Sequence, residues 1–140
     1  PRGALYEETR RRAEELGLGR RLSWIGYVPQ ADLVAAYNLA QALVFASGYE
    51  GFGLPVLEAM SCGTPVVTSR SGALPEVAGG AALLVDYDSP EQLAAAMTQV
   101  LDDGAVRATL REKGLRRAAQ LTWEKAARET LAVYRCVLGR

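Results

Sequence analysis

The sequence contains no histidine, and this absence excludes whole classes of catalytic site. A serine or cysteine nucleophile that depends on a histidine base cannot be built from these residues. The cysteines, Cys62 and Cys136, are too few to form a structural zinc site without histidine. Both lie in helical patterns, so we expect two buried free thiols, as is usual in a cytoplasmic protein.

The sequence also lacks an excess of either charge and a long hydrophobic run. The 16 basic and 16 acidic residues cancel, which argues against nucleic acid as a partner. No apolar run is long enough to cross a membrane and no signal peptide opens the chain, so a cytoplasmic location is expected. The first residue is not methionine, which is consistent with an excerpt of a longer protein.

One helical segment, residues 107–121, is nevertheless rich in basic side chains. These are Arg107, Arg111, Lys113, Arg116 and Arg117. A solvated surface helix is the simpler interpretation, because Glu112 offsets part of the charge. The alternative is contact with an anionic acceptor or with a membrane, which would place the protein at the inner membrane face.

Short apolar runs alternate with helical patterns along the whole chain. Strands are predicted at residues 22–25, 42–46, 66–68 and 82–85. Helices are predicted at 5–16, from Pro29, from Pro55, from Leu74, and over 90–101, 107–121 and 123–138. This alternation predicts an α/β domain with a Rossmann-like parallel sheet and helices on both faces. The length suits one domain.

The most informative stretch, residues 47–60, follows the predicted strand at 42–46. Gly51 and Gly53 permit unusual dihedral angles and a close approach of the backbone to a ligand. Pro55 suits the first helical position, where no backbone N–H is needed. The stretch therefore predicts a strand, a glycine turn and a helix start, whose free N–H groups form an anion site.

Two carboxylates flank this anion site: Glu50 on the turn and Glu58 in what we expect to be the first helical turn. Acids repel a phosphate, but they accept hydrogen bonds from sugar hydroxyls, as an acid does from the ribose in dinucleotide sites. Phosphates between two polyols describe a nucleotide sugar. The alternative is that Glu58 only complements the helix dipole and Glu50 is a solvated loop acid.

Ligands of open α/β sheets collect at the carboxyl ends of the strands. This rule places Tyr27, Glu50 and Ser71 at one edge, because each follows a predicted strand. Arg70 could also reach a phosphate there, although a surface arginine is the simpler interpretation.

The run from residue 50 to residue 67, EGFGLPVLEAMSCGTPVV, resembles the signature of the retaining GT-B glycosyltransferases. This family includes glycogen synthases, sucrose synthases and many bacterial mannosyl- and glucosyltransferases. The resemblance continues through SGALPEVAG at 71–79 and AALLV at 81–85. Within the family, the chain is most similar to bacterial mannosyltransferases of polysaccharide and O-antigen assembly.

The resemblance implies that residues 1–140 are part of the C-terminal, donor-binding domain, which normally has six strands. The first two strands, with an arginine and a lysine that grip the donor diphosphate, would precede this chain. The acceptor-binding domain would be absent as well. We therefore expect an inactive fragment with open sheet edges, which either belongs to a longer chain or self-associates.

The resemblance also implies the reaction and its site. A hexose, mannose or glucose, would pass with retention from a GDP- or UDP-sugar to the hydroxyl of an acceptor sugar, a lipid-linked glycan or another acceptor. No metal or cofactor is implied. Glu50 would be the catalytic residue that holds the transferred sugar, and Glu58 would hold the ribose. The remaining donor-binding residues would be Gly51, Phe52, Gly53, Leu54 and Ser71, with Tyr27, Val28 and Leu33 against the base.

Two other kinds of function remain open. The first is another enzyme of the same fold, either a sugar-nucleotide epimerase or a phosphorylase. An epimerase usually relies on histidine, which this chain lacks, and a phosphorylase needs a pyridoxal lysine. The only lysines, Lys113 and Lys125, lie in late helices. The second alternative is a nucleotide-sugar-binding module without catalytic activity.

Overall fold

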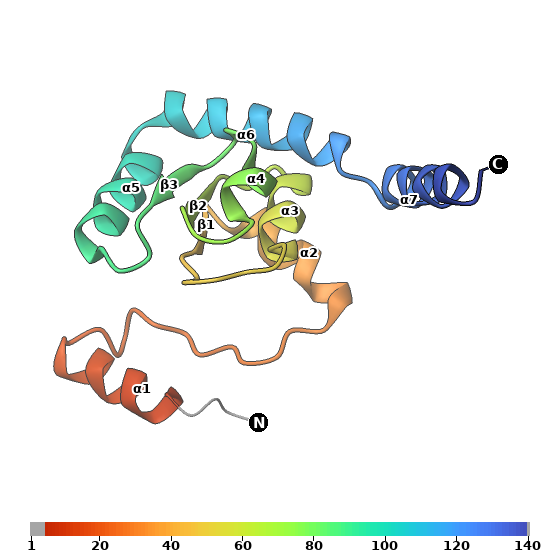
Figure 1. Cartoon of the computed structure of the whole chain (residues 1–140). Helices are drawn as coiled ribbons and strands as arrows, with labels where there is room; N and C mark the ends of the chain where they lie inside the picture. Colours follow the sequence, from red (N-terminus) through yellow and green to blue (C-terminus); the bar gives the residue numbers. More distant parts are fainter. Residues whose placement is uncertain (1–4, 140) are drawn as a thin grey trace.

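The computed structural model describes residues 5–139 as parallel strands and helices in alternating order (Figure 1). The strands are β1 (Leu43–Phe45), β2 (Val66–Ser69) and β3 (Leu83–Val85). The helices are α1 (Tyr6–Glu15), α2 (Gln30–Leu39), α3 (Leu54–Ser61), α4 (Leu74–Ala78), α5 (Pro90–Asp102), α6 (Gly104–Gln120) and α7 (Trp123–Val137). The predicted α/β class is confirmed.

The sheet has the strand order β1-β2-β3, and both pairs are parallel. Successive residues of the central strand β2 face opposite sides, as a pleated strand requires. Val66 packs against α3 and α4, whereas Val67 packs against α5 and α6. Two apolar clusters therefore form the core, one on each face of the sheet, and the predicted covering of both faces by helices is confirmed.

The predicted strand at residues 22–25 is wrong. The segment lies outside the sheet, and Ile25 is 73% exposed. An extended segment becomes a strand only when a neighbouring strand pairs with its N–H and C=O groups. The described residues offer it no such neighbour; its aromatic contact is an edge-to-face pair between Tyr6 and Trp24, whose ring centroids lie 5.5 Å apart.

The strand predicted at 42–46 is confirmed, and it lies at an edge of the sheet, which agrees with the expectation of open sheet edges. Val44 of β1 is 37% exposed, and β2 is its only strand neighbour among the described residues. The expectation of two buried thiols is also wrong: Cys62 is half-buried and Cys136 is exposed. Cys136 is exposed because α7 leads away from the sheet and has no buried residue (Figure 1).

Helix α6 fastens three other helices through its arginines. Arg107 donates to the carbonyls of Val100 and Leu101 in the last turn of α5, at 2.9 and 2.6 Å. Arg111 donates to the carbonyl of Gly63, just after α3, at 3.2 Å. These carbonyls lie at the carboxyl ends of α5 and α3, where carbonyls lack a partner in the helix and the dipole of the helix is negative. A guanidinium there stabilises the helix end.

Arg117 does the same for α4. Its Nε and Nη2 donate to the carbonyls of Val77 and Glu76, at 3.0 and 2.7 Å. Gly79 leaves room for this contact: its φ is +55°, and a Cβ there would lie 2.6 Å from Nε of Arg117. The basic side chains that the sequence suggested for solvent or a membrane therefore include three with a structural task.

We expect Arg117→Ala to lower the free energy of unfolding by about 2 kcal/mol, because two carbonyls lose a charged donor. The matched control is Arg116→Ala. Among the described residues, Arg116 pairs only with Glu112, on the exposed face of α6 at 3.2 Å, so the expected loss is below about 0.5 kcal/mol. Urea denaturation of both variants measures the difference. Equal losses would show that capping of α4 contributes nothing.

Candidate functional site: the carboxyl edge of the sheet

Two loops meet at the carboxyl edge of the sheet. The loop at 46–53 follows β1, and the loop at 70–73 follows β2. Ser69 Oγ donates to the carbonyl of Ser47 at 2.5 Å, and the Ala73 N–H donates to the carbonyl of Glu50 at 3.1 Å. Glu50 and the loop that carries Ser71 are thus brought together, as the carboxyl-end rule predicts.

The sequence reasoning missed Gly72, which makes this approach possible. Its φ is +55°, and a Cβ at this position would lie 2.5 Å from the carbonyl oxygen and 2.9 Å from the nitrogen of Glu50. Both neighbours are backbone atoms that cannot swing aside. Only glycine fits, because it has no Cβ and tolerates the left-handed conformation. The available signal was the Ser-Gly pair directly after a predicted strand.

The glycine turn leads into α3 as predicted, with one shift in register. Gly53 is the N-cap, with φ of +93°, and Leu54 rather than Pro55 opens the helix. Among the described residues, the backbone N–H groups of 51–53 donate to no protein acceptor. Together with the positive end of the α3 dipole, these N–H groups can bind an anion.

The two carboxylates lie on either side of these N–H groups along the chain. Glu50 is half-buried on the loop, and within residues 5–139 its carboxylate takes part in no ion pair. Glu58 lies in the second turn of α3, not in the first as predicted, because the helix begins at Leu54. Dipole complementation, which fades within the first turn, therefore explains Glu58 poorly.

Glu58 has a partner that the sequence reasoning missed. The Tyr37 hydroxyl on α2 donates to Oε2 of Glu58 at 3.0 Å. Burial, then the hydrogen bond to Glu58 and its charge, raise the pKa of Tyr37 to about 12. The phenol therefore stays protonated near neutral pH and remains a donor. In the sequence, Tyr37 fits the apolar spacing of its helix and resembles an ordinary packing residue.

The predicted strand that was to carry Tyr27 to the carboxyl edge does not form. Tyr27 is 88% exposed on the segment that fails to form a strand, so the carboxyl-end rule does not apply to it. Val28 and Leu33 are half-buried, and Leu33 lies on α2, the helix that carries Tyr37. Arg70 pairs with Asp86 at 3.4 Å, which agrees with a surface role.

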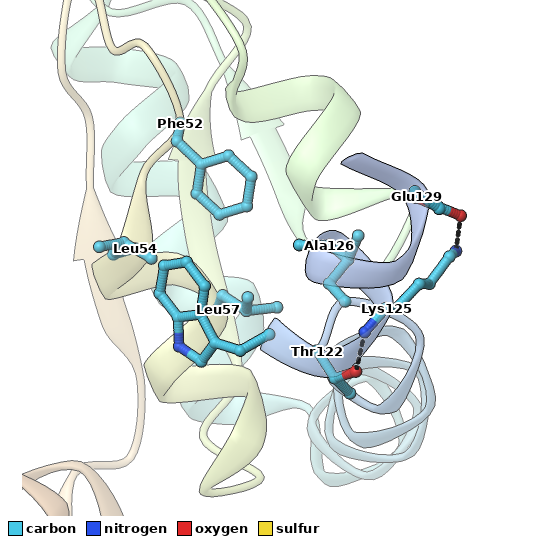
Figure 2. A pocket seen from close by; sticks show the side chains of 9 residues that line it. Phe52, Leu54, Leu57, Thr122, Lys125, Ala126 and Glu129 are labelled. Atoms are coloured by element: carbon cyan, nitrogen blue, oxygen red, sulfur yellow. Dashed lines mark hydrogen bonds and ion pairs between the residues drawn. The ribbon is translucent and has the colours of Figure 1, made fainter. Parts of the chain in front are cut away.

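An apolar cavity of about 360 Å³ lies next to the signature loop (Figure 2). Phe52, Leu54 and Leu57 line one side of it, and the start of α7 lines the other. Lys125 and Glu129 pair at its rim, 3.8 Å apart. Neither Glu50, Glu58 nor Ser71 lines this cavity, so it lies beside the polar site and is not part of it.

Metal-binding and membrane-spanning features are absent from the described part of the chain. Residues 5–139 contain no cluster of three or more histidine, cysteine or acidic side chains that could hold a metal ion. No described helix combines the length and the apolar character needed to cross a membrane.

Comparison with known proteins shows the family to which this chain belongs. Residues 2–117 match the family described as "Glycosyl transferases group 1". The O-antigen chain mannosyltransferase B of Escherichia coli is 44% identical over 120 residues, which cover 84% of this chain and 32% of that protein. The chain thus spans about a third of the length of this relative.

Solved structures agree with this result. Sucrose-phosphate synthase from Thermosynechococcus elongatus superposes with a TM-score of 0.87 at 34% identity, covering 98% of this chain and 35% of that one. Anabaena Alr3699/HepE, solved in complex with UDP, gives a TM-score of 0.81 at 26% identity, covering 91% and 37%. The chain therefore belongs to the group 1 glycosyltransferases and corresponds to the C-terminal domain of their retaining GT-B fold.

Proposed function

We propose that the chain binds the nucleotide-sugar donor of a hexosyltransferase that retains the anomeric configuration. The observation that carries this proposal is the arrangement at the carboxyl edge. Along the chain, open N–H groups at 51–53 lie between Glu50 and Glu58, and the loop of Ser71 is hydrogen-bonded to the backbone of Glu50. A diphosphate suits the N–H groups, and the hydroxyls of two sugars suit the carboxylates.

The relatives support a nucleotide sugar as the ligand. One transfers mannose, as its name states, and the Anabaena protein was solved with UDP. We assign Glu58 to the ribose hydroxyls and Glu50 to the transferred hexose, mannose or glucose from a GDP- or UDP-sugar. The base would lie against Val28 and Leu33, with Tyr27 reaching it from the extended segment at 22–28.

In the proposed reaction, the bond between the anomeric carbon and the leaving phosphate oxygen breaks, and the acceptor oxygen forms a bond to the same face of that carbon. The proton of the acceptor hydroxyl passes to the leaving phosphate. The N–H groups of Phe52 and Gly53 stabilise the charge that grows on the diphosphate. Glu50 orients the hexose through its hydroxyls, so that the anomeric carbon faces the acceptor.

Glu58→Ala in the complete protein should weaken binding of UDP or GDP by about 1–3 kcal/mol, because a hydrogen bond to a charged acceptor is lost. Isothermal titration calorimetry measures this change. The matched control is Glu112→Ala, which removes an acid on the surface of α6 whose ion pair within residues 5–139 is with Arg116. Unchanged affinity in the Glu58 variant would refute the ribose assignment.

Glu50→Ala should reduce turnover about 10- to 100-fold and leave the affinity for the nucleoside diphosphate nearly unchanged. The diphosphate lacks the hexose, so only the reaction depends on this carboxylate. A transfer assay with GDP-mannose and UDP-glucose, combined with the same titration, measures both effects. A weaker affinity with normal turnover at saturation would contradict the role given to Glu50.

A further inference from the structure

The hydrogen bond between Tyr37 of α2 and Glu58 of α3 joins two residues that are 21 positions apart in the sequence. Two residues of α2, Leu33 and Tyr37, are half-buried, and the other eight residues of this helix are exposed. Leu33 and Tyr37 are four positions apart and share a face of the helix. Of these two side chains, Tyr37 is the one that packs against the apolar core.

Tyr37 is itself held firmly in place. Its ring packs against the apolar cluster that contains Val56 and Met60 of α3. Its backbone carbonyl accepts a hydrogen bond from Oγ1 of Thr64 at 2.7 Å, and Thr64 is only 4% exposed. The packing of the ring and the hydrogen bond from buried Thr64 therefore fix Tyr37 in place, with its hydroxyl at Glu58.

The carboxylate of Glu58 is only partly used by this contact. Oε2 accepts the hydrogen bond from Tyr37, whereas Oε1 accepts none from any residue in the described part of the chain. A glutamate has several rotatable bonds, and fixing it costs conformational entropy. A hydrogen bond to one oxygen fixes the side chain already in the free protein, so less entropy is lost when a ligand binds. The other oxygen stays open to a hydroxyl.

We propose that Tyr37 is a positioning residue, which fixes the carboxylate of Glu58 so that its open oxygen accepts the ribose hydroxyls of the donor. This inference rests on the ribose role of Glu58 in the proposed function. It adds α2 to the donor site: the helix that carries Leu33, assigned to the base, also orients the acid assigned to the ribose.

The experiment compares nucleotides with and without ribose hydroxyls. The complete protein is titrated with UDP or GDP, whichever binds more tightly, and with its 2′,3′-dideoxy counterpart. We expect Tyr37→Phe to weaken binding of the ribonucleotide about fivefold, because the Glu58 side chain must then be fixed at the moment the ribose binds. Binding of the dideoxy nucleotide should not change. Tyr134→Phe, an exposed tyrosine on α7, is the matched control.

A double variant shows whether Tyr37 acts through Glu58. In the Glu58→Ala background, Tyr37→Phe should have no further effect on ribonucleotide binding, because the side chain that it positions is already missing. A merely structural tyrosine would weaken binding in both backgrounds and would weaken the dideoxy nucleotide as well. Either result overturns the proposal.

The remaining outcomes separate this inference from the proposed function. If Glu58→Ala weakens only the ribonucleotide and Tyr37→Phe weakens neither ligand, the positioning role is wrong and the ribose assignment stands. If Glu58→Ala fails to discriminate between the two ligands, the ribose assignment is wrong, and the role of Tyr37 is overturned with it.

Discussion

The carboxyl edge of the sheet depends on the approach of Gly72 to the backbone of Glu50. Without a Cβ at position 72, the loop after β2 comes close enough for the Ala73 N–H to bond the Glu50 carbonyl. This bond fixes the carbonyl of Glu50, while the N–H groups that follow it at 51–53 donate to nothing in the described chain. One backbone contact thus both orders the loop and leaves its donors open for an anion.

Helices α3 and α4 have their amino ends at this edge, and arginines of α6 bind the carbonyls at their carboxyl ends. The amino end of α3 opens at the site, where free N–H groups are useful to a ligand. The carbonyls at the far ends of α3 and α4 are bound by Arg111 and Arg117 from α6. Both helices therefore keep a positive end toward the carboxyl edge, and the negative ends are neutralised away from it.

Local patterns in the sequence were enough to predict much of this arrangement. The strands at 42–46, 66–68 and 82–85 were predicted from short apolar runs, and the glycine turn that leads into α3 was predicted from Gly51, Gly53 and Pro55. The strand at 22–25 was wrong because strand formation needs a partner, and a partner is not a property of the segment itself. Its apolar residues predict burial only if something covers them.

The hydrogen bonds between residues far apart in the sequence could not be predicted. Tyr37 reaches Glu58 across 21 positions, and Arg117 reaches Glu76 across 41. In its own helix each looks ordinary, one as a packing residue and the other as a surface charge. The register of α3 was misjudged by one residue for a local reason, since Pro55 is tolerated in the second helical position as well as in the first.

The charges at the edge show what the proposed donor site still needs. A diphosphate would lie between Glu50 and Glu58, and both acids oppose its negative charge. N–H groups and a helix dipole offset only part of that repulsion, because each contributes about 1 kcal/mol or less at an exposed site. Arg70, the cation next to Ser71, is already paired with Asp86. We therefore expect a diphosphate at this edge to need cationic side chains other than Arg70.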